Sequence, residues 1–140
     1  MIVVDASAIV ALLAGEEPRA GEVRRALLEA DRPLHAPELL DLEVVSAVRK
    51  LVRRAEVSPE RVELAFEDLD DLAVRRWPHH PLLPRVWALR HALSPYDAAY
   101  LALAEALGAS LVTLDAGLAT VASGSVRVVA PCAGRSEYRC

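Results

Sequence analysis

Short runs of apolar residues alternate along the chain with longer segments in which apolar positions recur every three or four residues. The short runs predict β-strands, because a strand that is buried on both faces reads as a continuous apolar stretch. The longer segments predict helices that each turn an apolar stripe toward a core. The expected strands cover residues 2–4, 34–36, 74–77, 110–114 and 126–129. The expected helices cover residues 6–13, 19–29, 37–54, 59–72, 82–93, 95–107 and 117–121.

Strands and helices therefore alternate, which is typical of an α/β fold with a mostly parallel sheet. We expect a sandwich in which helices flank a short sheet of four or five strands. A length of 140 residues fits one domain that is large enough to bury a core. We assign residues 1–131 to this domain and residues 132–140 to a polar C-terminal tail.

The segment from Ser94 to Asp115 carries the clearest local signals. Ser94 and Pro95 form a typical helix start, because serine caps free N–H groups and proline lacks the N–H that has no partner there. Asp97 follows the cap by three residues, and Gly108 ends the helix. Apolar residues on nearly every face of this helix predict that it is buried. Asp97 and Asp115 also have purely structural interpretations, as a capping residue and a turn residue.

Further acidic residues stand near the ends of other predicted elements. Asp5 closes the first strand just before a helix begins. A carboxylate buried there must be protonated, hydrogen-bonded or bound to a cation, although Asp5 is also explained as a helix cap. Glu38, Asp41 and Glu43 crowd the start of the helix expected over residues 37–54, where the helix dipole favours negative charge. Periodicity does not choose among these three residues, and all three are also explained as surface acids.

Composition narrows the class of protein. No apolar run reaches the ~18 residues that span a bilayer, and the first residues lack the basic segment of a signal peptide. We therefore expect a cytoplasmic protein with no membrane partner. Cys132 and Cys140 are the only cysteines, so they cannot form a zinc site by themselves. We expect Trp77 and Trp87 to be packing residues rather than platforms for a ligand.

The net charge of −4 arises from 16 basic and 20 acidic residues and does not indicate a nucleic-acid binder. Four carboxylates that hold cations would change this balance, because 16 acidic residues would then face 16 basic ones. All basic residues except Lys50 are arginine, which suits contacts with phosphate.

Four sequence segments follow one another in order: VVDASAIVALL with Asp5, PELLDLEVVSAVRKL with Glu43, SPYDAAYLALAEALGA with Asp97, and SLVTLDAGL with Asp115. Together they resemble the PIN domain, the fold of small metal-dependent ribonucleases. More narrowly, they resemble the VapC toxins of bacterial and archaeal toxin–antitoxin pairs. A single D-x-S motif is not specific, but four motifs in this order are. The resemblance extends from residue 2 to about residue 129 and implies a PIN-like three-layer sandwich.

The resemblance also implies roles for particular residues. In the family, the acidic helix residue follows the proline by six positions and precedes a small polar residue by three. This spacing selects Glu43, with Ser46 downstream, over Asp41. Ser7 occupies the place of the small residue that supports the first aspartate. The implied metal-binding and catalytic residues are Asp5, Glu43, Asp97 and Asp115.

Carboxylates suit Mg²⁺ or Mn²⁺, which are hard ions that prefer oxygen ligands. Such an ion activates water and stabilises the charge that develops on phosphate. The resemblance thus implies the toxin of a type II toxin–antitoxin system, which hydrolyses RNA phosphodiester bonds with Mg²⁺ or Mn²⁺. It further implies a cognate antitoxin protein and a homodimer. Val45 and Val52 agree with such an interface, because they lie outside the main apolar stripe of their helix.

Two other classes of protein share part of this pattern. Phosphatases that form an aspartyl phosphate and signalling receiver domains also place an aspartate after the first strand. The phosphatases need a second aspartate where this chain has Ser7, and both classes need a late lysine, whereas no lysine follows Lys50. The remaining alternative is a non-catalytic PIN-like module that binds a partner protein or RNA. The presence of all four acidic residues argues against that alternative.

Overall fold

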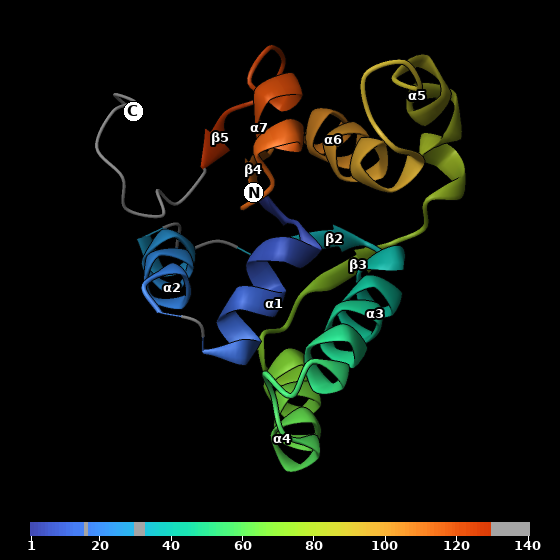
Figure 1. Cartoon of the computed structure of the whole chain (residues 1–140). Helices are drawn as coiled ribbons and strands as arrows, with labels where there is room; N and C mark the ends of the chain where they lie inside the picture. The colour runs from blue at the N-terminus through green and yellow to red at the C-terminus, as the bar shows by residue number, and fades with distance from the viewer. Residues whose placement is uncertain (16, 30–32, 130–140) are drawn as a thin grey trace.

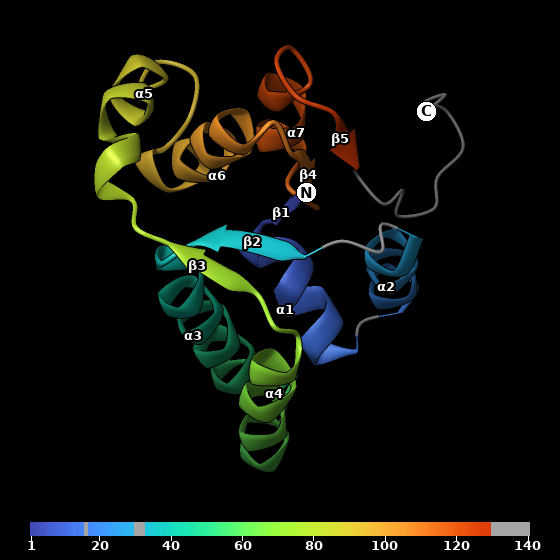
Figure 2. The same cartoon turned by 180° about the vertical axis from the view of Figure 1, so that it is seen from behind.

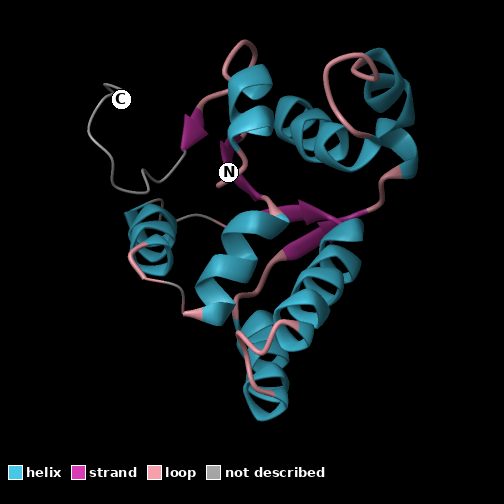
Figure 3. Cartoon of the chain, in the orientation of Figure 1, coloured by secondary structure: helices cyan, strands magenta, loops and turns pink. Residues whose placement is uncertain are grey.

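A five-stranded parallel sheet forms the centre of the computed structural model, which describes residues 1–15, 17–29 and 33–129 (Figures 1 and 3). The strand order is β3-β2-β1-β4-β5, and every neighbouring pair is parallel. The strands are β1 (Ile2–Val4), β2 (Leu34–Pro37), β3 (Arg75–Trp77), β4 (Ser110–Val112) and β5 (Val128–Val129). The prediction of a short parallel sheet is therefore confirmed, with five strands.

Helices cover both faces of this sheet and complete three layers. Figures 1 and 2 show α1 and α3 on one face and α6 and α7 on the other, with α5 packed against α6. The α-helices are α1 (Ala6–Ala14), α2 (Arg19–Glu29), α3 (Leu39–Arg53), α4 (Pro59–Asp71), α5 (Leu83–Ala88), α6 (Pro95–Leu107) and α7 (Ala116–Ala122). A 3₁₀ turn, η1 (His80–Leu82), precedes α5. Among the described residues, no helix is both long and apolar enough to cross a bilayer.

The core lies on both sides of the central strands β1 and β4. Val3, Val4, Leu111 and Val112 are fully buried, as expected for interior strands of a parallel sheet. Every residue from 98 to 104 of α6 is buried, which confirms that this helix lies inside the molecule. The expected stripe of α3 also faces the core through Leu40, Val44 and Val48.

Three predicted element boundaries differ from the structure for identifiable reasons. Pro37 pairs with Trp77 as the last residue of β2, so α3 begins at Leu39 instead of residue 37. The strand expected over residues 110–114 ends at Val112, because the Leu114 N–H donates to the Ser7 hydroxyl and not to a neighbouring strand. The strand expected over residues 126–129 is confined to residues 128–129.

The helix expected over residues 82–93 is wrong at its C-terminal end. The α-helix ends at Ala88, and residues 89–93 form hydrogen-bonded turns. The Arg90 guanidinium donates to the Trp87 carbonyl, which satisfies one of the free acceptors at the helix end. The C-terminal tail assigned to residues 132–140, including Cys132 and Cys140, lies outside the described residues.

Candidate active site

The sheet has a topological switch point between β1 and β4. From β1 the chain continues to β2 and β3 on one side, and β4 and β5 lie on the other side of β1. In open α/β sheets, ligands bind outside the carboxyl ends of the strands at such a switch point. Asp5 follows β1 directly, and its N–H donates to the Val112 carbonyl at the end of β4 over 3.0 Å. The sheet register therefore brings Asp5 beside residues 113–115.

Two hydroxyl groups hold the Asp5 carboxylate. Thr113 Oγ1 donates to Asp5 Oδ2 over 2.7 Å, and Ser7 Oγ donates to the same oxygen. Each hydroxyl oxygen in turn accepts a backbone N–H, from Asp115 at 3.0 Å for Thr113 and from Leu114 at 2.9 Å for Ser7. Because these N–H groups occupy lone pairs of the hydroxyl oxygens, the hydroxyl protons remain directed at the carboxylate. Ser7 thus has the supporting position that we predicted.

Burial dominates the electrostatics of Asp5, whose exposed fraction is only 5%. Loss of solvent raises the pKa of this carboxyl, and the hydrogen bonds from Ser7 and Thr113 offset part of the increase. A buried negative charge is costly unless hydrogen bonds or a cation compensate for it. Protein groups supply hydrogen bonds to Asp5, and a bound cation would compensate its negative charge further.

Glu43 approaches this position from α3 and is held by Tyr100 of α6. The Tyr100 hydroxyl donates to Glu43 Oε2 over 2.6 Å, and the tyrosine is fully buried. Burial raises the pKa of Glu43, and the negative charges of Asp5 and Asp97 raise it further, against the hydrogen bond from Tyr100. Burial and the neighbouring Glu43 also raise the pKa of Tyr100, so its hydroxyl stays protonated as a donor.

Asp97 lies in the first turn of α6 and combines a local role with proximity to Glu43. Ser94 Oγ accepts the Asp97 N–H at 3.2 Å and donates to Asp97 Oδ2 at 2.7 Å, which confirms the cap expected from the sequence. The charge of Asp97 nevertheless acts on Glu43 across the space between α6 and α3. Asp5, Glu43 and Asp97 therefore share one electrostatic environment although they come from three separate elements.

Asp115 takes a more peripheral place than the other three acids. It is exposed and caps α7, where its Oδ1 accepts the Leu118 N–H at 2.8 Å. Its backbone N–H binds Thr113, which connects it to Asp5 through one hydroxyl group. Asp115 is not among the charges that raise the pKa of Glu43. Within the described residues, no three acidic, histidine or cysteine side chains converge closely enough, in the conformations seen, to enclose one ion.

The three acids at the start of α3 differ in their partners. Asp41 faces Arg76 of β3, whose Nη2 lies 2.8 Å from Asp41 Oδ1. Glu38 lies 3.9 Å from His79 Nδ1 on the protein surface. Glu43 instead faces Tyr100 and other carboxylates. The selection of Glu43 stays a prediction, and these contacts support it.

Sequence reasoning missed the two residues that orient the site from within the core, Thr113 and Tyr100. Thr113 is a polar residue at the end of an apolar strand. With β4 placed beside β1, that position would have indicated a contact between Thr113 and Asp5. Tyr100 follows Asp97 by three positions on a helix with apolar residues on nearly every face. Nothing local in the sequence indicates that its hydroxyl meets a glutamate from another helix.

The donor set fits a divalent cation of the Mg²⁺ or Mn²⁺ type. All four predicted ligands are carboxylates, and such ions prefer oxygen donors. Among the described residues, Asp5, Glu43, Asp97 and Asp115 form no ion pair with arginine, lysine or histidine, whereas Asp41 has Arg76. Burial is the main cause of the raised pKa values of Asp5 and Glu43, and only hydrogen bonds, with no positive charge, act to lower them.

Comparison with known proteins gives consistent matches over most of the chain. The profile of the PIN domain matches residues 2–124. Ribonuclease VapC9 of Mycobacterium tuberculosis is 44% identical over 115 residues, which cover 82% of this chain and 86% of that protein.

Solved structures resemble the fold at lower sequence identity. The crystal structure of VapC20 from Mycobacterium tuberculosis, described as a toxin that cleaves the sarcin–ricin loop, has a TM-score of 0.69 at 21% identity, covering 91% of this chain and 98% of that one. A toxin–antitoxin complex from Klebsiella pneumoniae has a TM-score of 0.65 at 22% identity, with coverage of 94% and 98%.

Because Glu43 and Asp41 have different partners, we expect removal of their charges to change the stability of the fold in opposite directions. A carboxyl whose pKa is raised on folding stabilises the fold below the pKa of the unfolded chain and loses that contribution as the pH rises. Glu43→Gln should therefore raise the melting temperature at pH 7 in EDTA, because the amide oxygen can still accept the Tyr100 proton. The gain should shrink as the pH falls through the raised pKa of Glu43 and should be lost below the ordinary glutamate value of 4.5.

Asp41→Asn is the matched control on the same helix, and it should lower or barely change the melting temperature at pH 7. It removes a partly exposed ion pair with Arg76, an interaction typically worth about 0–1 kcal/mol. Thermal melts of both variants followed by circular dichroism at pH 7 and pH 4 make the comparison. Equal destabilisation by the two substitutions at pH 7 would contradict the electrostatic description of Glu43.

Proposed function

The chain belongs to the PIN-domain family and is a relative of the VapC ribonucleases, and we propose that it is a type II toxin that hydrolyses RNA phosphodiester bonds. The observation that carries this proposal is the acidic site at the switch point of the sheet. Asp5 and Asp97 act electrostatically on Glu43 there, and none of the three forms an ion pair with a cationic side chain among the described residues. The mutual repulsion of these carboxylates is relieved when divalent cations bind, and bound cations in turn attract the phosphate of RNA.

The proposed ligands of Mg²⁺ or Mn²⁺ are Asp5, Glu43, Asp97 and Asp115, directly or through water. When bound, such an ion supplies an activated water and balances the charge that develops on the phosphate during hydrolysis. Without a cation, the carboxylates repel the RNA backbone, since both carry negative charge. This requirement for charge balance is the physical reason for the proposed metal dependence.

The protein groups around the carboxylates fix their positions. Ser7 and Thr113 direct their protons at Asp5, and Tyr100 directs its proton at Glu43. Ser94 restrains Asp97 at the start of α6. These bonds hold side chains from β1, α3 and α6 in place before substrate arrives, and such preorganisation is what positions reacting groups productively.

The partners that we propose are RNA as substrate, a cognate antitoxin and a second copy of the chain, all meeting in the cytoplasm. The complex from Klebsiella pneumoniae supports the antitoxin, because a structural neighbour of this fold is described as a toxin–antitoxin complex. Exposed apolar side chains support the dimer. Leu42 and Val45 lie three residues apart on one side of α3 and are 75% and 46% exposed, whereas Val52 is only partly exposed.

Cleavage of RNA in the presence and absence of metal tests the nuclease proposal. The purified chain should cut a mixed RNA substrate with Mn²⁺ or Mg²⁺ and should stop when EDTA is added. Asp97→Asn and Glu43→Gln should abolish cleavage while the proteins stay folded, because each removes a ligand charge and retains the side-chain shape. Asp41→Asn should retain most of the activity.

Gel analysis of end-labelled RNA provides the measurement, with melting curves as the check on folding. Binding of RNA without cleavage under any of these metal conditions would favour the non-catalytic module. A more severe loss in Asp41→Asn than in Glu43→Gln would show that the wrong acid of α3 was chosen.

Light scattering at micromolar concentration tests the proposed dimer through α3. The wild-type chain should have twice the monomer mass of 15.1 kDa, and Leu42→Glu should shift it to the monomer. Leu28→Glu on α2 is the matched control, since Leu28 is 74% exposed but lies on another helix. A wild-type mass of one chain would contradict the dimer.

Co-expression with a small gene immediately upstream should relieve growth inhibition by this chain if that gene encodes the antitoxin.

A further inference from the structure

The segment from residue 72 to residue 96 contains no acidic residue, although the chain has 20. It carries four arginines, at positions 75, 76, 85 and 90, and therefore a charge of +4 in a chain whose net charge is −4. This acid-free segment connects α4 to α6 and includes β3, η1 and α5. Positive charge in this segment that is not paired with a carboxylate favours a polyanion.

The arginines of the acid-free segment have two kinds of partner. Arg76 and Arg85 pair with carboxylates, those of Asp41 and Glu105. Arg90 instead lies over the indole ring of Trp87, with its guanidinium carbon 4.7 Å from the ring centroid. Among the described residues, no carboxylate lies within ion-pair distance of Arg90. Its charge is therefore available to a negatively charged ligand.

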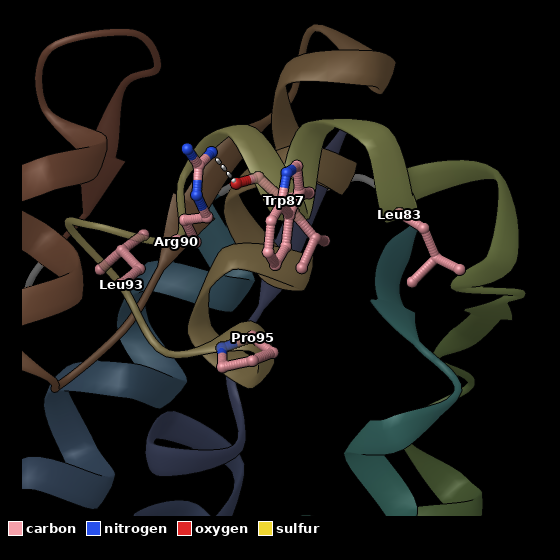
Figure 4. A pocket seen from close by; sticks show the side chains of 6 residues that line it. Leu83, Trp87, Arg90, Leu93 and Pro95 are labelled. Carbon is pink, nitrogen blue, oxygen red and sulfur yellow. Dashed lines mark hydrogen bonds between the residues drawn. The ribbon is translucent and has the colours of Figure 1, made fainter.

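A pocket of about 310 Å³ lies in this segment, at the lower end of the range for small-molecule sites. Figure 4 shows the Trp87 side chain reaching toward Pro95, with Leu93 and Arg90 to one side. The lining residues are Leu83, Val86, Trp87, Arg90, Leu93 and Pro95. Pro95 is also the first residue of α6, the helix whose first turn carries Asp97 of the acidic site.

Trp87 is 69% exposed, so the expectation that it is a packing residue is wrong. Trp77 differs, because it is partly buried and its indole N–H donates to His35 Nδ1 over 3.0 Å. An exposed indole that already holds an arginine presents a flat π-surface with a positive charge beside it. Single-stranded nucleic acids bind to such surfaces, since bases stack on aromatic rings while cations contact phosphate.

We propose that this pocket receives a nucleobase of the single-stranded RNA substrate next to the scissile phosphate. Trp87 stacks on the base, and Arg90 contacts the adjoining phosphate. The inference rests on the proposed nuclease function and makes Trp87 a determinant of which nucleotides are cut. A second copy of the chain is a poor occupant, because a two-fold contact through this face would bring together two Arg90 side chains, neither of which has a carboxylate partner among the described residues.

Fluorescence anisotropy with a labelled single-stranded RNA of about twelve nucleotides, in EDTA, tests the pocket. EDTA prevents cleavage, and it weakens RNA binding by the wild-type protein and the pocket variants alike, because their acidic sites are the same. Trp87→Ala should raise Kd roughly tenfold, the loss expected when one base no longer stacks on an aromatic ring. Trp87→Phe should restore most of the affinity. A fully abasic oligonucleotide of the same length should bind the wild-type protein and Trp87→Ala equally.

Arg90→Gln should also weaken binding and should reduce the dependence of Kd on salt, because it removes one phosphate contact. Arg127→Gln is the matched control, since Arg127 is an exposed arginine outside the acid-free segment. Equal effects of the two arginine substitutions would overturn the assignment of Arg90.

The outcomes separate this inference from the nuclease proposal. If the wild-type protein cleaves RNA but Trp87→Ala leaves Kd unchanged, the base pocket is wrong and the nuclease stands. If Trp87 determines RNA affinity but no cleavage occurs with any divalent ion, the pocket stands and the nuclease proposal fails. If Trp87→Ala converts a dimer to a monomer in light scattering and leaves Kd unchanged, the pocket belongs to a second copy and the inference is overturned.

Discussion

The burial of the Asp5 carboxylate at the end of the central strand is the constraint on which the rest of the site depends. Asp5 can remain there because Thr113, which lies 108 residues further along the chain, donates to it from the end of the neighbouring strand. A shift of one residue between β1 and β4 would turn Thr113 to the opposite face of the sheet. The register of these two strands is therefore part of the active-site geometry, and the buried apolar residues that fix it also serve the site.

Charge is distributed unevenly between this site and the remaining surface. Elsewhere, several carboxylates have arginine partners, as Asp41 has Arg76 and Glu105 has Arg85. At the switch point, Asp5 accepts hydrogen bonds from two hydroxyl groups and from the backbone, and Glu43 accepts one from the Tyr100 hydroxyl. Hydroxyl groups orient a carboxylate without neutralising it, so the site retains its negative charge. Proteins commonly sacrifice stability at functional sites in this way, and the raised pKa values of Asp5 and Glu43 indicate that cost.

The sequence predicted the architecture well because its signals were local. Apolar runs identified β1, β4 and β5, strands were also expected at β2 and β3, and the bounds of α2 agree with those expected. Ser94, Pro95 and Gly108 marked the ends of α6 through their own backbone chemistry. The resemblance to the PIN family singled out Glu43, and its contacts support that selection. Helix periodicity alone could not distinguish it from Asp41, because both acids border the same apolar stripe.

The features that escaped prediction depend on tertiary contacts. The roles of Thr113 and Tyr100 arise only when β4 lies beside β1 and α6 lies opposite α3. At the end of α5 the side chain of Arg90 folds back onto the Trp87 carbonyl and Trp87 is exposed, and no local signal in the sequence indicated either feature. The assignment of Asp115 to the metal site stays a prediction, since the structure shows it as the cap of α7.

The most direct test of the central claim is a crystal soaked in Mn²⁺ and measured for anomalous scattering. The account predicts a manganese peak in the crevice between Asp5, Glu43 and Asp97, and its loss in Asp5→Asn crystals treated in the same way. A manganese peak at Glu38 or Asp41, or an empty crevice in a crystal that binds Mn²⁺ elsewhere, would contradict it.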